Sequence, residues 1–162
     1  MRKKIIAANW KMHMTQAESE AFLTTFLHEI GDLDEVEIVI VPPFTAIPKV
    51  SELVTQTQNI KVGAQNMHWE RSGAFTGEIS PAMLRELFVR YVVLGHSERR
   101  TMFGETDEIV NRKVRAAYEA AARRFTGLLD ELCTELPALR KAANPAACEL
   151  NGVVARRMHV AV

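Results

Sequence analysis

The feature that most constrains the fold of this chain is a repeated alternation between short apolar segments and helical segments. Four runs rich in β-branched residues begin at residues 4, 37, 60 and 91 and read KIIAANW, EIVIVPP, IKVGAQN and YVVLG. Nearly continuous apolar runs of this length are typical of strands that are covered on both faces in a parallel sheet. The sequence therefore predicts four buried parallel strands.

Helical patterns fill the segments between and after these runs. The expected helices occupy residues 15–30, 45–54, 80–88 and 106–124. Their starts carry capping signals, because Thr15 and Glu18 fit a capping box and Ser80 precedes a proline at a first helical position. The last helix opens at Thr106 with acidic residues in its first turn and basic residues later, as the helix dipole favours.

Alternating strands and helices predict a parallel sheet with right-handed crossovers. The pattern alone leaves two alternatives open, a barrel and an open doubly wound sheet. A complete (β/α)8 barrel needs about 250 residues, so this chain of 162 residues is too short to close one. Four barrel strands would leave two open edges, to be covered by the rest of the chain, a second copy or another chain.

Composition excludes several classes of function. The 20 basic and 20 acidic residues cancel, so no overall field attracts nucleic acid or anionic lipid. The apolar run at the start is interrupted by Asn9 and Lys11 before it could form a signal peptide or a membrane span, which predicts a cytoplasmic protein. Cys133 and Cys148 belong to no CxxC or Cys/His motif. We therefore expect no metal site.

Polar residues follow three of the predicted strands directly. They are Asn9, Lys11, Gln65, Asn66, His96 and Glu98. Parallel α/β proteins place their chemistry at the carboxyl ends of the strands. A surface turn explains one such residue, but a set of six at this edge indicates a functional site.

These residues also carry a resemblance to a known family. The segments AANWKMH, GAQNMHWERSGAFTGEISPAML, YVVLGHSERR and FGETDEIVNRKVRAAYEA together resemble the amino-terminal half of triosephosphate isomerase, over about residues 3–120. The resemblance implies a partial (β/α)8 barrel of about four βα units. It also implies an isomerase of glycolysis and gluconeogenesis that interconverts dihydroxyacetone phosphate and glyceraldehyde 3-phosphate without a cofactor.

The resemblance assigns catalytic roles to His96, Lys11, Asn9 and Glu98. A neutral His96 would donate a hydrogen bond to the oxygen of an enediolate, and Lys11 would supply positive charge to the substrate. Asn9 would also contact the substrate, and Glu98 would orient Lys11. Taken singly, His96 would read as a turn or core residue, Lys11 as a surface lysine, and Asn9 and Glu98 as architectural residues.

A long loop at residues 65–78 matches the family's subunit-contact loop. A loop of this length that contains Trp69 and Phe75 is costly to leave in water, which favours an interaction role. The resemblance therefore implies a homo-oligomer, a dimer in the first instance. The residues expected at its interface are Gln65, Thr76, Arg99 and Glu105.

The resemblance ends near residue 120, and residues 121–162 are predicted to form a helical tail of unknown role. The expected apolar stripe of this tail comprises Phe125, Leu128, Leu129, Leu132, Leu136 and Leu139, with Pro137 ending the run. The family's glutamate base, lid loop and phosphate-binding loops have no match here, so the chain alone is expected to be inactive. The alternatives are a complementary half barrel from another chain, a non-catalytic half barrel that binds full-length isomerase, and a truncated, frameshifted or misjoined gene product.

Overall fold

The protein folds around a four-stranded parallel sheet with helices packed against it. The computed structural model describes residues 4–30 and 35–135, with side chains described as far as residue 121. The strands are β1 (Lys4–Asn9), β2 (Val36–Val41), β3 (Ile60–Ala64) and β4 (Tyr91–Val92), in that spatial order. Every neighbouring pair is parallel, with Lys4 opposite Val36 at the start of the first pair.

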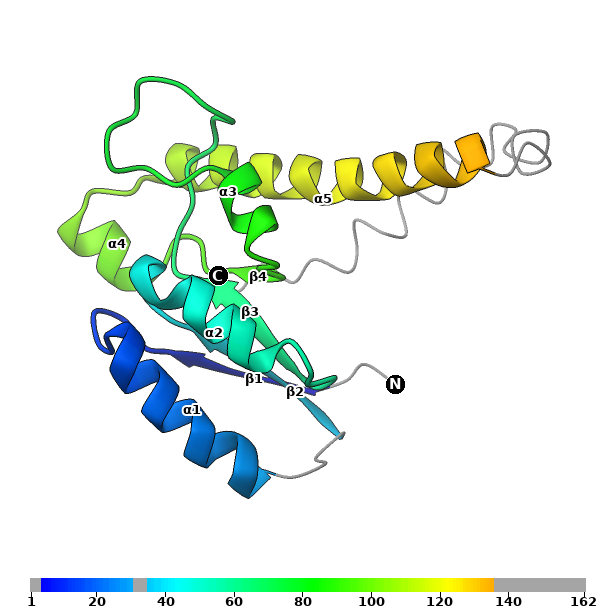
Figure 1. Ribbon diagram of the computed structural model, residues 1–162. Coiled ribbons are helices and arrows are strands. Elements are labelled where there is room, and N and C mark those ends of the chain that lie inside the picture. Colours follow the sequence, from blue (N-terminus) through cyan, green and yellow to red (C-terminus); the bar gives the residue numbers. More distant parts are fainter. Residues whose placement is uncertain (1–3, 31–34, 136–162) are drawn as a thin grey trace.

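The order of the strands decides between the two alternatives that the sequence left open. A doubly wound sheet reverses its strand order at a switch point, whereas here the order in space is the order in sequence. The helices α1 (Gln16–Ile30) and α2 (Ile47–Val54) lie side by side on one face of the curled sheet (Figure 1). The fold is therefore a sector of an α/β barrel, as predicted.

The expected helices are present, and their caps form as the sequence predicted. Glu18 accepts a hydrogen bond from the backbone N–H of Thr15 at 2.8 Å, and the Thr15 hydroxyl accepts from the Glu18 N–H at 3.3 Å. The Ser80 hydroxyl accepts from the Met83 N–H at the start of α3 (Pro81–Glu86). A short 3-10 turn, η1 (Phe44–Ala46), precedes α2.

Two elements differ from the sequence-based expectation. The polar segment after β4 forms a helix, α4 (Ser97–Met102), which is not among the helices that the sequence predicted. The final helix, α5 (Asp107–Glu135), is continuous past residue 120 and through Gly127. The side chains of the predicted apolar stripe and the break at Pro137 lie outside the described residues.

The hydrophobic core lies between the sheet and the helices. Its buried members include Leu23, Ile38, Ile40, Ile47, Val50, Ile60, Val62, Leu84 and Leu94. The prediction of burial on both faces is wrong for β1, where Ile6 is 57% exposed. The physical reason is that, among the described residues, only β2 pairs with β1, so its other edge has no neighbouring strand. No helix in the described part of the chain is long and apolar enough to span a membrane.

Candidate active site

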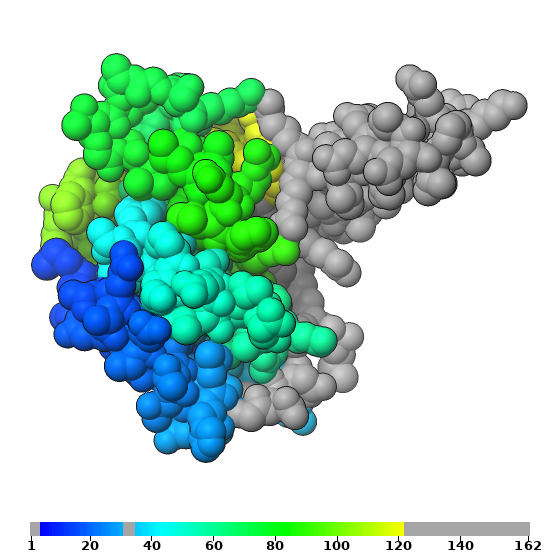
Figure 2. Space-filling model, viewed as in Figure 1, coloured from blue at the N-terminus to red at the C-terminus, as the bar shows by residue number. Residues whose placement is uncertain are grey.

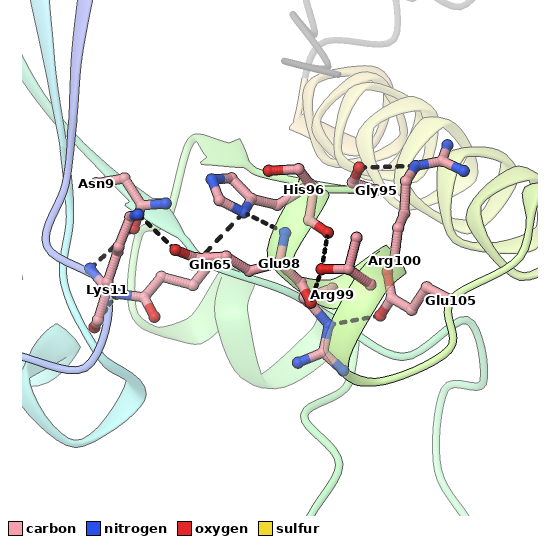
Figure 3. A network of polar contacts seen from close by, with 11 residues as sticks. Asn9, Lys11, Gln65, Gly95, His96, Glu98, Arg99, Arg100 and Glu105 are labelled. Atoms are coloured by element: carbon pink, nitrogen blue, oxygen red, sulfur yellow. Dashed lines mark hydrogen bonds and ion pairs between the residues drawn. The ribbon is translucent and has the colours of Figure 1, made fainter.

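The carboxyl ends of the strands bring the predicted site residues together. Asn9 ends β1, Gln65 follows β3, and His96 and Glu98 lie at the start of α4 just beyond β4. Figure 3 shows these side chains converging with that of Lys11 on one patch of the sheet edge. The expected juxtaposition of residues far apart in sequence is therefore present.

An ion pair joins the turn after β1 to helix α4. The Lys11 Nζ lies 2.5 Å from the Glu98 Oε1, and about half of the Lys11 side chain and 39% of the Glu98 side chain are exposed. The hydrogen bond from Lys11 is the main cause that holds the pKa of Glu98 below its ordinary value. Glu98 is therefore an acceptor for the Lys11 ammonium group, and the part of this pair in catalysis stays a prediction.

The backbone of Lys11 adopts the left-handed conformation, with a φ of 53°, which is strained for a residue with a side chain. Two neighbours hold it there. The Asn9 Oδ1 accepts a hydrogen bond from the Lys11 N–H at 3.0 Å, and the Gln65 amide donates to the Lys11 carbonyl at 2.7 Å. Gln65 also donates to the Val41 carbonyl at 3.1 Å, so it ties the Lys11 turn to the end of β2.

His96 is the N-cap residue of α4. Its Nδ1 accepts a hydrogen bond from the Glu98 N–H at 3.2 Å. The Glu98 Oε2 lies farther away, 3.6 Å from Nδ1, beyond hydrogen-bonding distance. Because an accepting ring nitrogen carries no proton, this geometry assigns the proton of a neutral His96 to Nε2.

Gly95 makes the turn that places His96 at the start of α4. Gly95 has a φ of +66°, and a Cβ built there would lie 3.0 Å from a methyl group of Val110. A side chain at this position would therefore meet both backbone strain and a close contact. Gly95 permits the abrupt change from strand β4 to helix α4.

A buried polar network lies behind α4. The Glu105 carboxylate accepts from Arg99 Nε at 2.5 Å and also from Lys113, and the Lys113 ammonium donates to the Asn66 Oδ1 at 2.8 Å. The side chains of Glu105 and Lys113 are each 4% exposed. Burial raises the pKa of Glu105, but the hydrogen bonds and charges of Lys113 and Arg99 outweigh it, so this pKa lies below its ordinary value.

Sequence reasoning missed the place of Lys113 in this network. The available signal was a lysine at helical spacing from apolar residues, three positions after Val110 and four before Ala117, both of which are buried. Arg99 and Glu105, predicted at a subunit interface, are here bound to each other within one chain. Their contact with a second copy stays a prediction.

The loop of residues 65–78 is held by its own aromatic residues. His68 is buried and stacks on Trp69, with ring centroids 4.1 Å apart, and its ring centroid lies 4.4 Å from that of Phe75. The Arg112 guanidinium of α5 lies over the Trp69 ring. Thr76 is exposed near the end of the loop, which forms part of the molecular surface beside α3 (Figure 2).

The fold and this site define the chain as part of an α/β barrel protein whose polar groups gather at the carboxyl ends of the strands. A lysine held by a carboxylate and a histidine whose Nδ1 accepts from the Glu98 N–H can together stabilise negative charge that develops on a bound oxygen. Comparison with known proteins is consistent with this class. The family model described as triosephosphate isomerase matches residues 4–126, and the chain belongs to the triosephosphate isomerase family.

Curated relatives of the same name resemble the chain over most of its length. The triosephosphate isomerase of Dictyoglomus thermophilum is 54% identical over 118 residues, which are 73% of this chain and 47% of that protein. The proteins of that name from Symbiobacterium thermophilum and a Synechocystis species are each 53% identical over 82% of this chain, and the match covers 49% and 52% of their lengths. The chain thus spans about half the length of these relatives. A second family model, described as AbpE bacteria, matches residues 94–162.

Proposed function

We propose that this chain contributes Asn9, Lys11, His96 and Glu98 to the interconversion of dihydroxyacetone phosphate and glyceraldehyde 3-phosphate. The observation that carries the proposal is the convergence of the Lys11–Glu98 ion pair with a histidine whose Nδ1 is occupied by the Glu98 N–H. Membership of the family supports the choice of reaction.

The proposed chemistry follows from the charge that develops during the reaction. Removing a proton from the carbon next to a carbonyl places negative charge on the carbonyl oxygen and produces an enediolate. In the proposal, His96 donates from Nε2 to that oxygen, and Lys11 faces the oxygen or the phosphate with its ammonium group. Loss of one such preorganised donor costs about 3 to 4 kcal/mol of transition-state stabilisation.

We also propose that the described residues do not complete the site. The Glu98 carboxylate lies 3.6 Å from the His96 Nδ1, but it is engaged by Lys11, so it is a poor candidate for the base that removes the carbon-bound proton. A positioned base contributes roughly 10² to 10⁴ in rate. The base and the main phosphate grip are therefore proposed to come from outside the described residues, through a complementary half barrel.

The exposure of β1 favours a second candidate function, a half barrel that acts by associating with a full-length isomerase. An edge strand with apolar side chains on its surface is a template for pairing with another chain. This candidate predicts that the tagged chain captures full-length isomerase from a defined mixture of the two purified proteins. Turnover by the chain alone would argue against it.

The first experiment is a titration of the ¹⁵N-labelled chain with glycerol 3-phosphate, an unreactive three-carbon phosphate, followed by assay of glyceraldehyde 3-phosphate isomerisation. The protein should come from a host that lacks its own isomerase. We expect chemical-shift changes at Lys11 and His96, lost in Lys11→Met, and no turnover. Absence of binding at both residues would overturn the site. Turnover that disappears in His96→Gln would uphold the site and overturn the proposal of a missing base.

A further inference from the structure

Arg100 makes three hydrogen bonds near His96, two from its side chain and one from its backbone. Its Nε donates to the Gly95 carbonyl at 2.9 Å, and its Nη1 donates to the Asp107 Oδ1 at 2.7 Å. Its backbone N–H donates to the His96 carbonyl at 3.1 Å. Figure 3 shows the guanidinium of Arg100 extending back along α4 to Gly95.

These contacts act on the peptide that sets the direction of the His96 side chain. The Gly95 carbonyl belongs to the peptide unit between Gly95 and His96, so a hydrogen bond to it restrains the rotation of that peptide plane. The left-handed φ of Gly95 leaves this turn with the conformational freedom of a glycine unless something restrains it. Arg100 packs directly there, since a Cβ built on Gly95 would lie 3.2 Å from its Nη2.

The neighbouring arginine, Arg99, makes its side-chain contacts at the other end of α4. Arg99 directs its side chain to Glu105 and stacks its guanidinium on Phe103, at the far end of α4 from His96. Arg100 directs its side chain to the near end and to Asp107, the first residue of α5. The two arginines therefore secure opposite ends of the same short helix.

From this geometry we propose that Arg100 is a positioning residue for His96. By holding the Gly95–His96 peptide against the start of α5, it keeps the Nδ1 of His96 on the Glu98 N–H and leaves Nε2–H free to donate. Asp107 assists by orienting the guanidinium, and its contribution is the smaller one because its side chain is 87% exposed. The importance of this role for catalysis rests on the proposed function, whereas the positioning itself does not.

The test measures the hydrogen bond between His96 and Glu98 by nuclear magnetic resonance of the full chain. The variants are Arg100→Met, which keeps an apolar stem and removes the donors, Arg100→Lys, Asp107→Asn, and the double variant Arg100→Met/Asp107→Asn. Arg115→Met is the matched control, because Arg115 is an exposed arginine of α5. The readouts are the amide exchange rate of Glu98 and the ¹⁵N shifts of the two ring nitrogens of His96.

Arg100→Met removes the hydrogen bond from the charged Arg100 to the Gly95 carbonyl, and we expect the Glu98 amide to exchange about tenfold faster as a result. A tenfold change corresponds to a loss of about 1.4 kcal/mol, the size expected for a hydrogen bond with a charged donor. The Nδ1 and Nε2 shifts should move toward each other, as the ring samples both tautomers. Arg100→Lys should recover part of both effects. Asp107→Asn should show a smaller change alone and none in the Arg100→Met background.

Unchanged readouts at His96 and Glu98 in a folded Arg100→Met variant would overturn the proposal. So would an equal acceleration at the Ile38 amide, which donates to Asn59 in the sheet, because that would show a loss of global stability. These outcomes are separate from those of the ligand titration. A chain that binds no triose phosphate but shows the expected shifts would uphold the positioning role and overturn only the proposed function.

Discussion

The Lys11 ammonium and the Glu98 carboxylate form a 2.5 Å ion pair across 87 positions of sequence. The contact joins the turn after β1 to the first turn of α4, at the two ends of the four-stranded sheet. It exists because each strand ends at the same edge and the sheet curls. The strained backbone of Lys11 is tolerated there because Asn9 and Gln65 satisfy its N–H and its carbonyl.

Removing the charge of Lys11 should raise the pKa of Glu98. Because the hydrogen bond from Lys11 is the largest cause of the lowering, Lys11→Met should return the pKa of Glu98 toward its ordinary value of 4.5. The measurement is a pH titration of carboxyl ¹³C shifts. Glu18 is an internal control, since hydrogen bonds from Thr15 lower its pKa and Lys11 plays no part there. An unaltered titration of Glu98 would contradict this assignment.

Replacing Glu105 should be the most destabilising single change in the polar network. Glu105→Gln leaves the buried Lys113 without its carboxylate, and breaking one side of a buried pair costs about 3 kcal/mol or more. Chemical denaturation measures the free energy of unfolding. The double variant Glu105→Gln/Lys113→Met should lose less than the sum of the single variants, because it removes both charges; strict additivity would refute the coupling.

The same carboxylate should make stability depend on pH. The pKa of Glu105 is lowered on folding, so its contribution is complete above the ordinary value of 4.5 and is lost as the pH falls through the lowered pKa of the folded state. We expect the free energy of unfolding to decline below about pH 4.5. The decline should be shallower in Glu105→Gln, and an identical slope in both proteins would exclude Glu105 as its source.

Phe88→Gly should stabilise the protein. Phe88 lies one residue past Leu87, the C-cap of α3, with a φ of 58°, and it is 72% exposed. Its N–H donates to the Arg85 carbonyl, and the Val89 N–H donates to the Leu84 carbonyl. This is a Schellman cap, whose left-handed position favours glycine. Relief of about 1 to 2 kcal/mol of strain should exceed the entropic cost of glycine, about 0.5 to 1 kcal/mol.

The control for this change is Phe88→Ala, which removes the exposed ring but keeps the strain. Thermal unfolding of the three proteins separates the two effects. We expect the alanine variant to unfold close to the parent and the glycine variant at a higher temperature. A stability loss in both variants would show instead that the Phe88 ring makes a contact that stabilises the fold.

The proposed dimer should depend on the loop of residues 65–78. Thr76 is exposed in the single chain, and an aspartate there would become an unpaired charge on burial in an interface. We expect Thr76→Asp to shift the protein toward the monomer in sedimentation velocity. Gln56→Asp, at an exposed position after α2, should leave the distribution unchanged. A parent chain that is monomeric at all accessible concentrations would contradict the dimer.

The sequence by itself determined the features that depend on neighbours along the chain. Examples are the capping box at Thr15, the N-cap at Ser80 and the alternation of strand and helix. Each depends on residues that are close in sequence, and all are present. The edge that carries the site follows from the same alternation, because parallel strands all end on one side. The family motifs added the candidate roles of Lys11 and His96.

Only the tertiary structure decided which distant groups meet. It paired Lys113 with Asn66, 47 positions away, and it directed Gln65 to the turn at Lys11. It also made a helix of residues 97–102 and left β1 exposed at the edge of the sheet. The physical reason is that local patterns encode backbone geometry over a turn or two, whereas ion pairs, burial and strand neighbours depend on how the sheet curls and on which edge is covered.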